Sequence, residues 1–424
     1  MQKYHILTYG CQMNYSDSER FASILEFNGF EYTSRPKDAD CIIINSCSIR
    51  QKAEDRIVGL GRKMQPLKLS NPKLRIILSG CMAKRGWNNK TNSKYIDHLK
   101  KIMPWLDDIV ETKEFFQNSP HSNYALIWPA SAYIPVSFGC DHFCTYCIVP
   151  FARGKEVCRT FEEIKHEFDL AILHGVKNIV LLGQTVNRWR NQSSIGPQSF
   201  WELCKELDKG KGDFWLSFMS SHPNYISTEF IDFLAKSKHF RPYFHLALQS
   251  GSDKILARMN RRYNYADFKK IALYYKKRLP NATLSTDIIV GFPGETEEDF
   301  NETVKAMSEL NFDMAYISEF SPRTGTAAAR IPDDVSQKIK AQRKTYLNDK
   351  ILAVTALNNN NKLIGSVRDC LIEKINSKFI MARLDNNKEI QISIPKSPKL
   401  HTINSFRKVK IISANPWALK GELL

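Results

Sequence analysis

Long apolar runs are missing from this chain of 424 residues. No stretch approaches the roughly 20 apolar residues of a membrane-spanning helix, and residues 1–6 lack the apolar core of a secretion signal. We therefore expect no membrane segment and a cytoplasmic protein. Thiols stay reduced in the cytoplasm, so the ten cysteines are better explained as metal ligands, catalytic groups or core residues than as disulfides.

Acidic residues are in short supply. The chain has 44 Asp and Glu against 61 Lys and Arg, a formal charge of +17. The excess lies at the two ends: residues 1–131 carry a net charge of +6 and residues 355–424 carry +7. This distribution suits a polyanionic partner but does not identify one. A solvated basic surface kept for solubility is the alternative.

The N-terminal part, residues 1–125, predicts an open parallel α/β domain because short apolar runs alternate with helix-like segments. The clearest strands are residues 4–8, 41–44 and 74–78, and each is followed within a few residues by a cysteine: Cys11, Cys47 and Cys81. Ligands gather outside the carboxyl ends of strands in such sheets. The three cysteines are therefore expected to converge.

A second βα series follows, and we place the linker between Pro104 and Pro135, around residues 119–123. Six strands are predicted, which favours an incomplete (β/α)6 barrel over residues 126–354. Helices are expected at 161–173 and 297–310, with Thr296 as an N-cap and Asp299 in the first turn. The strands are expected at residues 133–137, 178–182, 215–219, 243–248, 283–290 and 314–320.

The composition changes again at the asparagine-rich run 357–362, after a helix expected at 335–353. Short alternating runs such as 379–384 and 389–394 predict a small all-β module over residues 355–424. This module has no cysteine triplet and no obvious catalytic group. Its charge of +7 therefore predicts that it supplies affinity for a polyanionic partner and no chemistry.

The strongest local signal is the run from Cys140 to Cys147, which places Cys140, Cys144 and Cys147 in a CxxxCxxC pattern directly after a strand. Three thiolates bind three corners of a cubane cluster and leave one iron open. A structural zinc site needs four ligands, usually as two pairs, and no second pair exists. His142 lies inside the loop, where closing a tetrahedron would be strained.

This element resembles the cluster-binding loop of the radical S-adenosylmethionine (radical SAM) superfamily, whose fold is also a partial barrel. The resemblance implies that the open iron holds the amino and carboxylate groups of S-adenosylmethionine. It also implies electron transfer that cleaves the sulfonium to methionine and a 5′-deoxyadenosyl radical.

The resemblance narrows to the methylthiotransferases and covers nearly the whole chain. The segments around Cys11, Cys47 and Cys81 resemble the cysteine motifs that hold a second cubane in those families. The last module is similar to a TRAM domain, an RNA-binding barrel, which implies that residues 355–424 bind RNA. Residues 50–54 and 183–187 most resemble the MiaB branch, which acts on N6-isopentenyladenosine beside the tRNA anticodon. Ser46, Thr185 and Ala247 depart from the usual residues, but none of these changes removes a ligand. Further matches are residues 8–14, 45–54, 79–83, 138–154, 249–252, 286–296 and 321–326.

By this resemblance we expect two [4Fe-4S] clusters and two S-adenosylmethionine molecules, one as methyl donor and one as radical source. The reaction would place a methylthio group on C2 of the adenine, with the protein holding both centres and the base in a shielded cavity. Expected partners are the tRNA anticodon stem-loop, an electron donor such as a flavodoxin or ferredoxin, and a sulfur source. A monomer is expected.

Gln184, Asn187, Gln249 and Asp287 occupy or closely follow the ends of barrel strands, where cofactor contacts collect. Tyr146 lies between the last two cluster ligands and is expected to present its backbone or ring to the adenine. The loop that begins at Gly291 resembles the family's adenine-contacting segment. A structural capping or turn role is an equal alternative for each. Arg153 and Arg323 are assigned to RNA phosphate or the S-adenosylmethionine carboxylate in preference to structural ion pairs. The expected cofactor-binding residues are Tyr146, Gln184, Asn187, Gln249, Asp287 and Gly291.

Four cysteines stand apart from the motifs, and we expect no chemistry from them: Cys41, Cys158, Cys204 and Cys370.

Three alternative functions remain at this stage. The first two are methylthiotransferases that act on a ribosomal-protein side chain or on threonylcarbamoyladenosine in tRNA. The third is an RNA-binding protein whose clusters are only structural.

Overall fold

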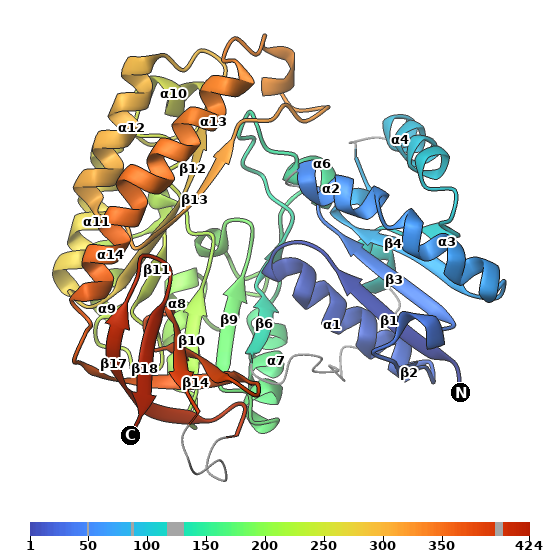
Figure 1. Cartoon of the computed structure of the whole chain (residues 1–424), viewed down its shortest axis with the longest axis horizontal. Helices are drawn as coiled ribbons and strands as arrows, with labels where there is room; N and C mark the ends of the chain where they lie inside the picture. The colour runs from blue at the N-terminus through green and yellow to red at the C-terminus, as the bar shows by residue number, and fades with distance from the viewer. Residues whose placement is uncertain (49–50, 86–88, 117–130, 395–401) are drawn as a thin grey trace. The chain divides into compact units, whose positions relative to one another are not determined.

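The computed structural model describes residues 1–48, 51–85, 89–116, 131–394 and 402–424. Two compact units make up the chain (Figure 1). Unit 1 comprises Met1–Trp128, Ser137–Val157 and Ser321–Ala329, and unit 2 comprises Pro129–Val136, Cys158–Phe320 and Arg330–Leu424. The linker expected at residues 119–123 lies outside the described residues.

Unit 1 is built on a parallel five-stranded sheet in the order β2-β1-β3-β4-β5. Its strands are β1 (Lys3–Thr8), β2 (Glu31–Tyr32), β3 (Cys41–Ser46), β4 (Arg75–Gly80) and β5 (Asp108–Ile109). Its helices are α1 (Gln12–Phe27), α2 (Gln51–Val58), α3 (Gly61–Ser70), α4 (Asn89–Ile102), α5 (Thr112–Phe116) and α6 (Val149–Arg153). A short pair, β7 (Ser137–Phe138) with β8 (Val157–Cys158), precedes and follows the CxxxCxxC loop.

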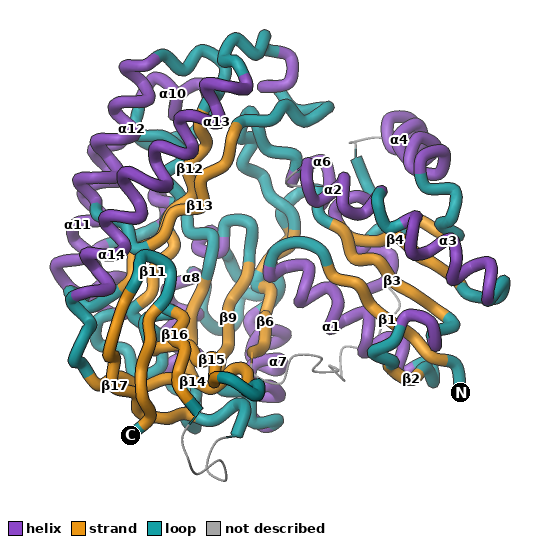
Figure 2. The backbone as a smooth tube through the Cα atoms, viewed as in Figure 1, coloured by secondary structure: helices purple, strands orange, loops and turns teal. Residues whose placement is uncertain are grey.

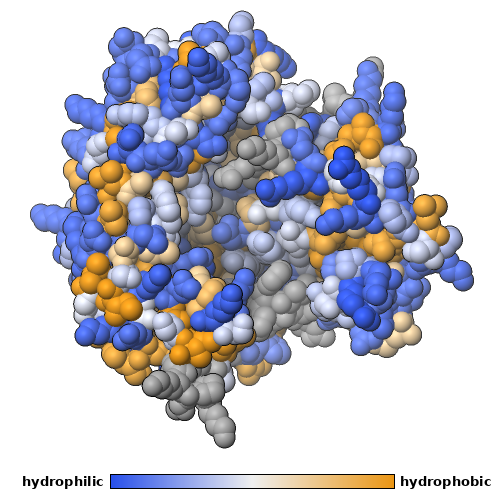
Figure 3. Space-filling model, in the orientation of Figure 1, coloured by the Kyte–Doolittle hydropathy of each residue, from blue (hydrophilic) through white to orange (hydrophobic). Residues whose placement is uncertain are grey.

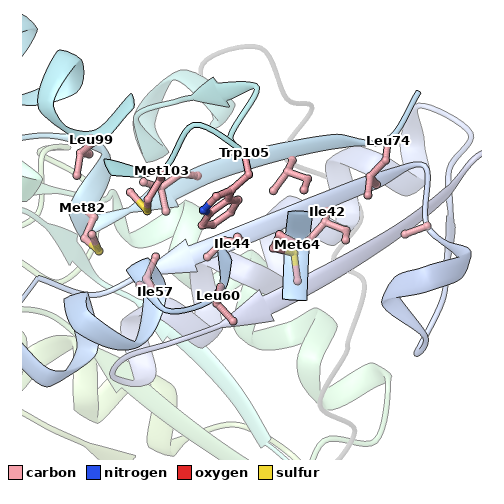
Figure 4. Packing of buried hydrophobic residues seen from close by; sticks show 13 residues of the cluster. Ile42, Ile44, Ile57, Leu60, Met64, Leu74, Met82, Leu99, Met103 and Trp105 are labelled. Atoms are coloured by element: carbon pink, nitrogen blue, oxygen red, sulfur yellow. The ribbon is translucent and has the colours of Figure 1, made fainter. Parts of the chain in front are cut away.

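The central strands of this sheet are apolar because helices cover them. All six residues of β3 are buried. Ile42 and Ile44 of β3 pack in one cluster with Leu78 of β4 and with Met103 and Trp105 after α4 (Figure 4). Burial of this kind contributes about 25 cal/mol per Å2 of apolar surface, and it holds the central strands in place.

Unit 2 contains six parallel barrel strands in two three-stranded sheets, β10-β9-β6 and β11-β12-β13. Parallel bridges Leu216–Phe240 and Ser221–Leu246 connect the β10 region to the β11 region. The expected incomplete six-stranded barrel is thus confirmed. The strands are β6 (Ser131–Pro135), β9 (Asn178–Leu182), β10 (Trp215–Phe218), β11 (Tyr243–His245), β12 (Thr283–Val290) and β13 (Met314–Glu319).

Helices α11, α12 and α13 flank strands β12 and β13 on one side (Figure 2). Thr296 caps α12 through a capping box with Asp299, as the sequence predicts. The helices of this unit are α7 (Phe161–Leu173), α8 (Phe200–Asp208), α9 (Thr228–Leu234), α10 (Asp253–Arg258), α11 (Tyr265–Arg278), α12 (Glu297–Leu310), α13 (Gln337–Tyr346) and α14 (Ala353–Asn361).

One helix boundary was predicted wrongly. The chain does not leave the helical state at Ala353, because a π-helical segment, Leu347–Leu352, leads into α14, which runs through the asparagine run to Asn361. The start expected for the last domain, residue 355, therefore falls inside a helix.

The C-terminal strands form a closed barrel in the order β14-β15-β16-β18-β17, as expected for a TRAM-like module. Leu384, Ile390 and Ile411 are among the residues that fill its core. The strands are β14 (Val367–Ile375), β15 (Phe379–Leu384), β16 (Glu389–Ser393), β17 (Phe406–Ala414) and β18 (Leu419–Leu423).

This small barrel packs against the amino-terminal ends of the larger barrel's strands. The rings of Trp215, the first residue of β10, and Phe406 lie 4.7 Å apart. Lys388 Nζ donates to Asp313 Oδ1, just before β13, at 2.6 Å. The small barrel is therefore an integral part of unit 2.

On the face drawn in Figure 3, hydrophilic residues cover most of the surface and hydrophobic residues form separate patches.

Candidate active site

The three post-strand cysteines of unit 1 reach the same edge of the sheet. Cys11 is the N-cap of α1 after β1, and Cys47 and Cys81 directly follow β3 and β4. These strands are parallel neighbours, so their carboxyl ends coincide. Cys47 and Cys81 are buried and Cys11 is half-buried. Sequence separations of more than thirty residues thus hide a compact thiol set.

Glycines before two of these cysteines allow the close approach. Gly10 has φ +143°, and a Cβ placed there would lie 2.9 Å from Cys47 Cβ. Gly80 has φ +84°, and its Cβ would lie 2.5 Å from Asn45 Oδ1 and would overlap the Ser46 carbonyl oxygen. Only glycine fits both the left-handed backbone and the space at position 80.

A buried polar network, which the sequence analysis did not identify, holds these strand ends together. Asn14 Nδ2 donates to Asn45 Oδ1 at 2.9 Å and to the Ser46 carbonyl at 3.0 Å. Asn45 Nδ2 donates back to the Asn14 carbonyl at 2.6 Å. Ser48 Oγ donates to the carbonyl of Cys81 at 3.1 Å. The signal in the sequence was the polar residue at the end of each apolar strand.

Arg153 contacts one thiol of this set, that of Cys81. Its guanidinium donates from Nη2 to Asp17 Oδ2 at 2.8 Å and from Nε to Cys81 Sγ at 3.2 Å. Burial opposes the charge of Arg153, but the Asp17 carboxylate with Cys81 and Cys11 raises its pKa well above the usual value. Burial also raises the pKa of the Cys11 thiol, an effect that Arg153 opposes.

The preference for phosphate or carboxylate ligands at Arg153 and Arg323 was wrong, because both side chains form buried ion pairs. Arg153 pairs with Asp17, and Arg323 Nη1 lies 3.7 Å from Glu54 Oε2. Spacing alone could not reveal partners that lie 136 residues away in the case of Asp17.

The loop that carries Cys140, Cys144 and Cys147 lies between β7 and α6. Cys140 is buried, whereas Cys144 and Cys147 are half-buried. The base of the loop is closed by Cys140 N–H donating to the Gly154 carbonyl at 3.1 Å. The backbone N–H of His142 lies 3.4 Å from Cys140 Sγ, so the chain directs a donor at the sulfur. Tyr146 is half-buried within this loop.

The predicted cofactor residues of the barrel lie after strands β9, β11 and β12, or on β12 itself. Gln184 is half-buried after β9. The amide of Asn187 bridges the next loop, because Nδ2 donates to the His222 carbonyl at 2.8 Å and Oδ1 accepts from His222 N–H at 2.9 Å. Both ends of that amide are therefore used within the protein, which is the structural alternative kept for this residue.

Gln249 and Asp287 lie on neighbouring strand ends. Gln249 has φ 71°, its N–H donates to the Asp287 carbonyl at 2.8 Å, and its buried Oε1 has no hydrogen-bond partner in the described structure. Asp287 Oδ2 lies 3.5 Å from Nε2 of His245. His245, which sequence reasoning missed, is buried at the end of β11, and no described group bonds its Nδ1.

Gly291 follows β12 with φ +69°, and a Cβ there would overlap the Lys340 side chain. Its N–H donates to Glu295 Oε2 at 2.6 Å. Close packing therefore explains the glycine without any ligand, and an adenine contact remains a prediction.

Two observations bear on whether the expected groups fit. Among the described residues, no three Cys, His, Asp or Glu side chains lie close enough to hold a single metal ion. A cubane has its thiolate ligands on separate iron corners, and three thiols at one sheet edge, with a guanidinium bonded to one sulfur, suit such a group. The unpartnered Gln249 Oε1 and His245 Nδ1 suit a polar cofactor at the barrel strand ends.

The remaining cysteines lie in different surroundings. Burial raises the pKa of Cys41 to about 11 and that of Cys370 to about 12, and Cys204 is fully buried. Cys41 and Cys370 pack within apolar clusters. Cys158 is half-buried in β8. The described part of the chain holds no helix with both the length and the apolar character to cross a membrane.

Family models match the N-terminal part of the chain and most of the larger barrel. The Radical SAM superfamily model matches residues 134–307, and that of Uncharacterized protein family UPF0004 matches residues 3–99. The radical S-adenosylmethionine methyltransferase TsrM from Kitasatospora setae shares the fold, with a TM-score of 0.51, 14% identity, and coverage of 75% of this chain and 73% of that chain.

Three relatives that match over nearly their whole length carry the name tRNA-2-methylthio-N(6)-dimethylallyladenosine synthase. The protein of Alkaliphilus oremlandii is 34% identical over 100% of this chain and 93% of its own length. The protein of Chromobacterium violaceum is 34% identical over 100% and 99%, and that of Thermodesulfovibrio yellowstonii is 35% identical over 99% and 98%. With this identity along its whole length, the chain belongs to the tRNA-2-methylthio-N(6)-dimethylallyladenosine synthase family of radical SAM enzymes.

Proposed function

We propose that this chain is a radical SAM methylthiotransferase that modifies C2 of N6-isopentenyladenosine next to the anticodon of tRNA. Family membership along the whole chain carries the proposal. The convergence of Cys11, Cys47 and Cys81 at one sheet edge supports it, because an enzyme with only the CxxxCxxC loop would have no need for a second thiol set.

We assign the ligands of two [4Fe-4S] clusters to the two cysteine triplets. Cys140, Cys144 and Cys147 would hold one, and Cys11, Cys47 and Cys81 the other. When bound, the clusters and two S-adenosylmethionine molecules would supply the methyl group and the radical chemistry. In this assignment residues 1–125 hold the second cluster, residues 126–354 the barrel with its cluster, and residues 355–424 the RNA-binding module.

The protein's own part is to position groups and to shield them. Gln249 Oε1 and His245 Nδ1 are buried acceptor and ring-nitrogen positions without partners in the described structure, so they would orient a polar cofactor. Tyr146, Gln184, Asp287 and Gly291 remain proposed cofactor contacts. Asn187 would position the loop after β9 through its two bonds to His222.

We further propose a monomer in the cytoplasm that receives electrons from a flavodoxin or ferredoxin and draws on a separate sulfur source. The net charge of +7 over residues 355–424 supports tRNA as the partner of the small barrel.

Nucleoside mass spectrometry tests the substrate. The reduced, reconstituted protein is incubated in one reaction with an isopentenylated anticodon stem-loop, a threonylcarbamoylated stem-loop and candidate ribosomal protein. The expected result is a methylthio mass gain on the isopentenylated RNA alone. A gain on another substrate alone would transfer the assignment to that class, and S-adenosylmethionine cleavage without any gain would leave only a radical SAM enzyme.

RNA affinity is tested with point variants of exposed lysines, since deleting the small barrel would uncover Trp215 and leave Asp313 without Lys388. Lys410 and Lys420 are exposed on β17 and β18. Changing both to alanine is expected to flatten the log-log salt dependence of tRNA binding by roughly 0.7 to 0.9 per lost phosphate contact. Lys211→Ala, at an exposed position of the larger barrel, is the control. An unchanged slope in the double variant would move the RNA surface elsewhere.

A further inference from the structure

The contacts of Arg153 exceed those of an ordinary buried ion pair. Its side chain and that of Asp17 are almost fully buried, at 8% and 0% exposure. Only one oxygen of Asp17 is bonded to Arg153, and Asp17 Oδ1 has no hydrogen-bond partner in the described structure. The guanidinium directs its Nε–H at Cys81 Sγ, 3.2 Å away.

A neutral thiol is a weak acceptor for such a donor. A thiolate sulfur accepts a charge-assisted hydrogen bond much more strongly. A buried arginine whose partner carboxylate is half satisfied is costly unless further negative charge lies close by. Cys81 as a ligand of a cluster would supply that charge, so the arginine suits the occupied site better than the free thiol.

The position of Arg153 in the chain gives it a second connection. It ends α6, which begins at Val149, two residues after Cys147. One short segment therefore carries the last thiol of the CxxxCxxC loop and the cation that contacts the other thiol set.

We propose that Arg153 is a positioning residue that raises the reduction potential of the cluster held by Cys11, Cys47 and Cys81, and that Asp17 opposes it. The proposal rests on the ligand assignment made under Proposed function. Reduction adds one electron to the cluster and breaks no bond, so the site gains one negative charge. Net charge and hydrogen bonds to sulfur set such potentials: the Arg153 cation stabilises the reduced form, and the Asp17 anion destabilises it.

The test uses the full chain with Cys140, Cys144 and Cys147 changed to alanine, so that one cluster remains. Dithionite supplies the electron, and the fraction of reduced cluster is followed by electron paramagnetic resonance as the potential is varied. Arg153→Gln is expected to shift the midpoint to more negative potential, and Asp17→Asn to more positive potential. The double variant Asp17→Asn with Arg153→Gln should return toward the parent value, since it removes both charges. Arg153→Lys, which keeps the charge, should shift less than Arg153→Gln.

Opposite shifts from the two members of one ion pair separate tuning from support of the fold. Loss of a purely structural pair would lower the unfolding temperature in both variants and leave both midpoints unchanged, and that result would overturn the proposal, as would shifts in the same direction. Arg343→Gln is the control, because Arg343 is equally buried and pairs with Glu295 at 2.7 Å in unit 2. It should not move the midpoint.

Two further outcomes are distinguishable. Absence of iron from the parent with the three alanines would contradict the ligand assignment itself. Should Arg153→Gln fail to fold, Asp17→Asn still decides the direction in which the midpoint potential moves, and Arg153→Lys shows whether the charge matters.

Discussion

The two cysteine triplets of unit 1 are built in opposite ways. Cys140, Cys144 and Cys147 lie within eight residues, in a loop closed at its base by Cys140 N–H and the Gly154 carbonyl. Cys11, Cys47 and Cys81 come from three strands and meet only because β1, β3 and β4 pair in register. One short segment is therefore enough to bring the first set together, whereas the second set forms only when the sheet has folded.

The difference shows in what surrounds each set. The local loop uses backbone donors of its own, such as His142 N–H toward Cys140 Sγ. The sheet-edge set depends on a network from distant segments, including the Asn14–Asn45 pair and the Arg153–Cys81 contact. Damage to the fold should therefore disable the set of Cys11, Cys47 and Cys81 before the other set. Damage to the loop should disable only the set of Cys140, Cys144 and Cys147.

Removing each triplet should give the largest effect. Reconstituted protein is expected to carry about eight irons, four for each cubane. Changing Cys140, Cys144 and Cys147 to alanine should halve the iron and abolish S-adenosylmethionine cleavage. The same change at Cys11, Cys47 and Cys81 should halve the iron but retain cleavage. Iron analysis and detection of 5′-deoxyadenosine measure both, and Cys158→Ala is the control. Cleavage retained in both triple variants would contradict the assignment.

Gly139→Ala should disable the local loop alone. Gly139 has φ +71°, and a Cβ there would overlap the Lys155 carbonyl oxygen and lie 2.6 Å from the Gly154 carbonyl oxygen. The loop base must open, so about half of the iron and all cleavage should be lost. Gly154→Ala also requires a positive φ, +82°, but nothing lies within 4 Å of its Cβ, so it should retain more of the iron and of the cleavage than Gly139→Ala does. Equal losses in the two variants would mean that backbone strain, not the overlap, controls the loop.

Gly80→Ala should disable the sheet-edge set in the same manner. Gly80 has φ 84° and ψ −156°, a backbone region that costs a residue with a side chain roughly 1–3 kcal/mol, and the overlap with Ser46 and Asn45 adds roughly 1–3 kcal/mol. Gly29→Ala, with φ +83° and nothing within 4 Å, should cost only the first amount in urea unfolding. Cleavage should survive in Gly80→Ala while about half of the iron is lost. Loss of cleavage with an intact fold would show that the two sets are not independent.

The same contrast explains which features the sequence predicted. Local signals were sufficient for α12, whose Thr296 and Asp299 capping box fixes its start, and for the buried strand β12 (Thr283–Val290). They failed at α14, where the change of composition at the asparagine-rich run 357–362 was taken as the end of the helix. There Asn359 Nδ2 donates to the Asn311 carbonyl at 3.1 Å and Asn360 Nδ2 to the Asn415 carbonyl at 2.8 Å, and these tertiary bonds keep the helix.

Site prediction met the same limit. The loop pattern could be recognised from spacing, and the sheet-edge cysteines from their positions after strands. The partners of Arg153 and Arg323 could not, because an ion pair between distant segments leaves no periodic or spacing signal. His245 was missed because it lies inside the run expected to form a strand, residues 243–248, where a single polar residue gives no sign that the strand ends there.

The smallest expected effect comes from Ser48, whose Oγ donates to the Cys81 carbonyl at 3.1 Å in a buried site. Ser48→Ala removes one buried hydrogen bond between the segments that carry Cys47 and Cys81, which should cost about 1 kcal/mol in unfolding free energy. Ser70→Ala is matched to it, since Ser70 Oγ also donates to a carbonyl, that of Leu67 at 2.9 Å, but at an exposed position. This control should cost less than about 0.5 kcal/mol. During chelation Ser48→Ala should release its sheet-edge iron faster than the parent, whereas iron in the local loop should leave at the parent rate. Because long-range bonds assemble the sheet-edge set, the loss of even one such bond should change the release rate there. Release of the sheet-edge iron from Ser48→Ala at the parent rate would show that strand pairing alone is sufficient.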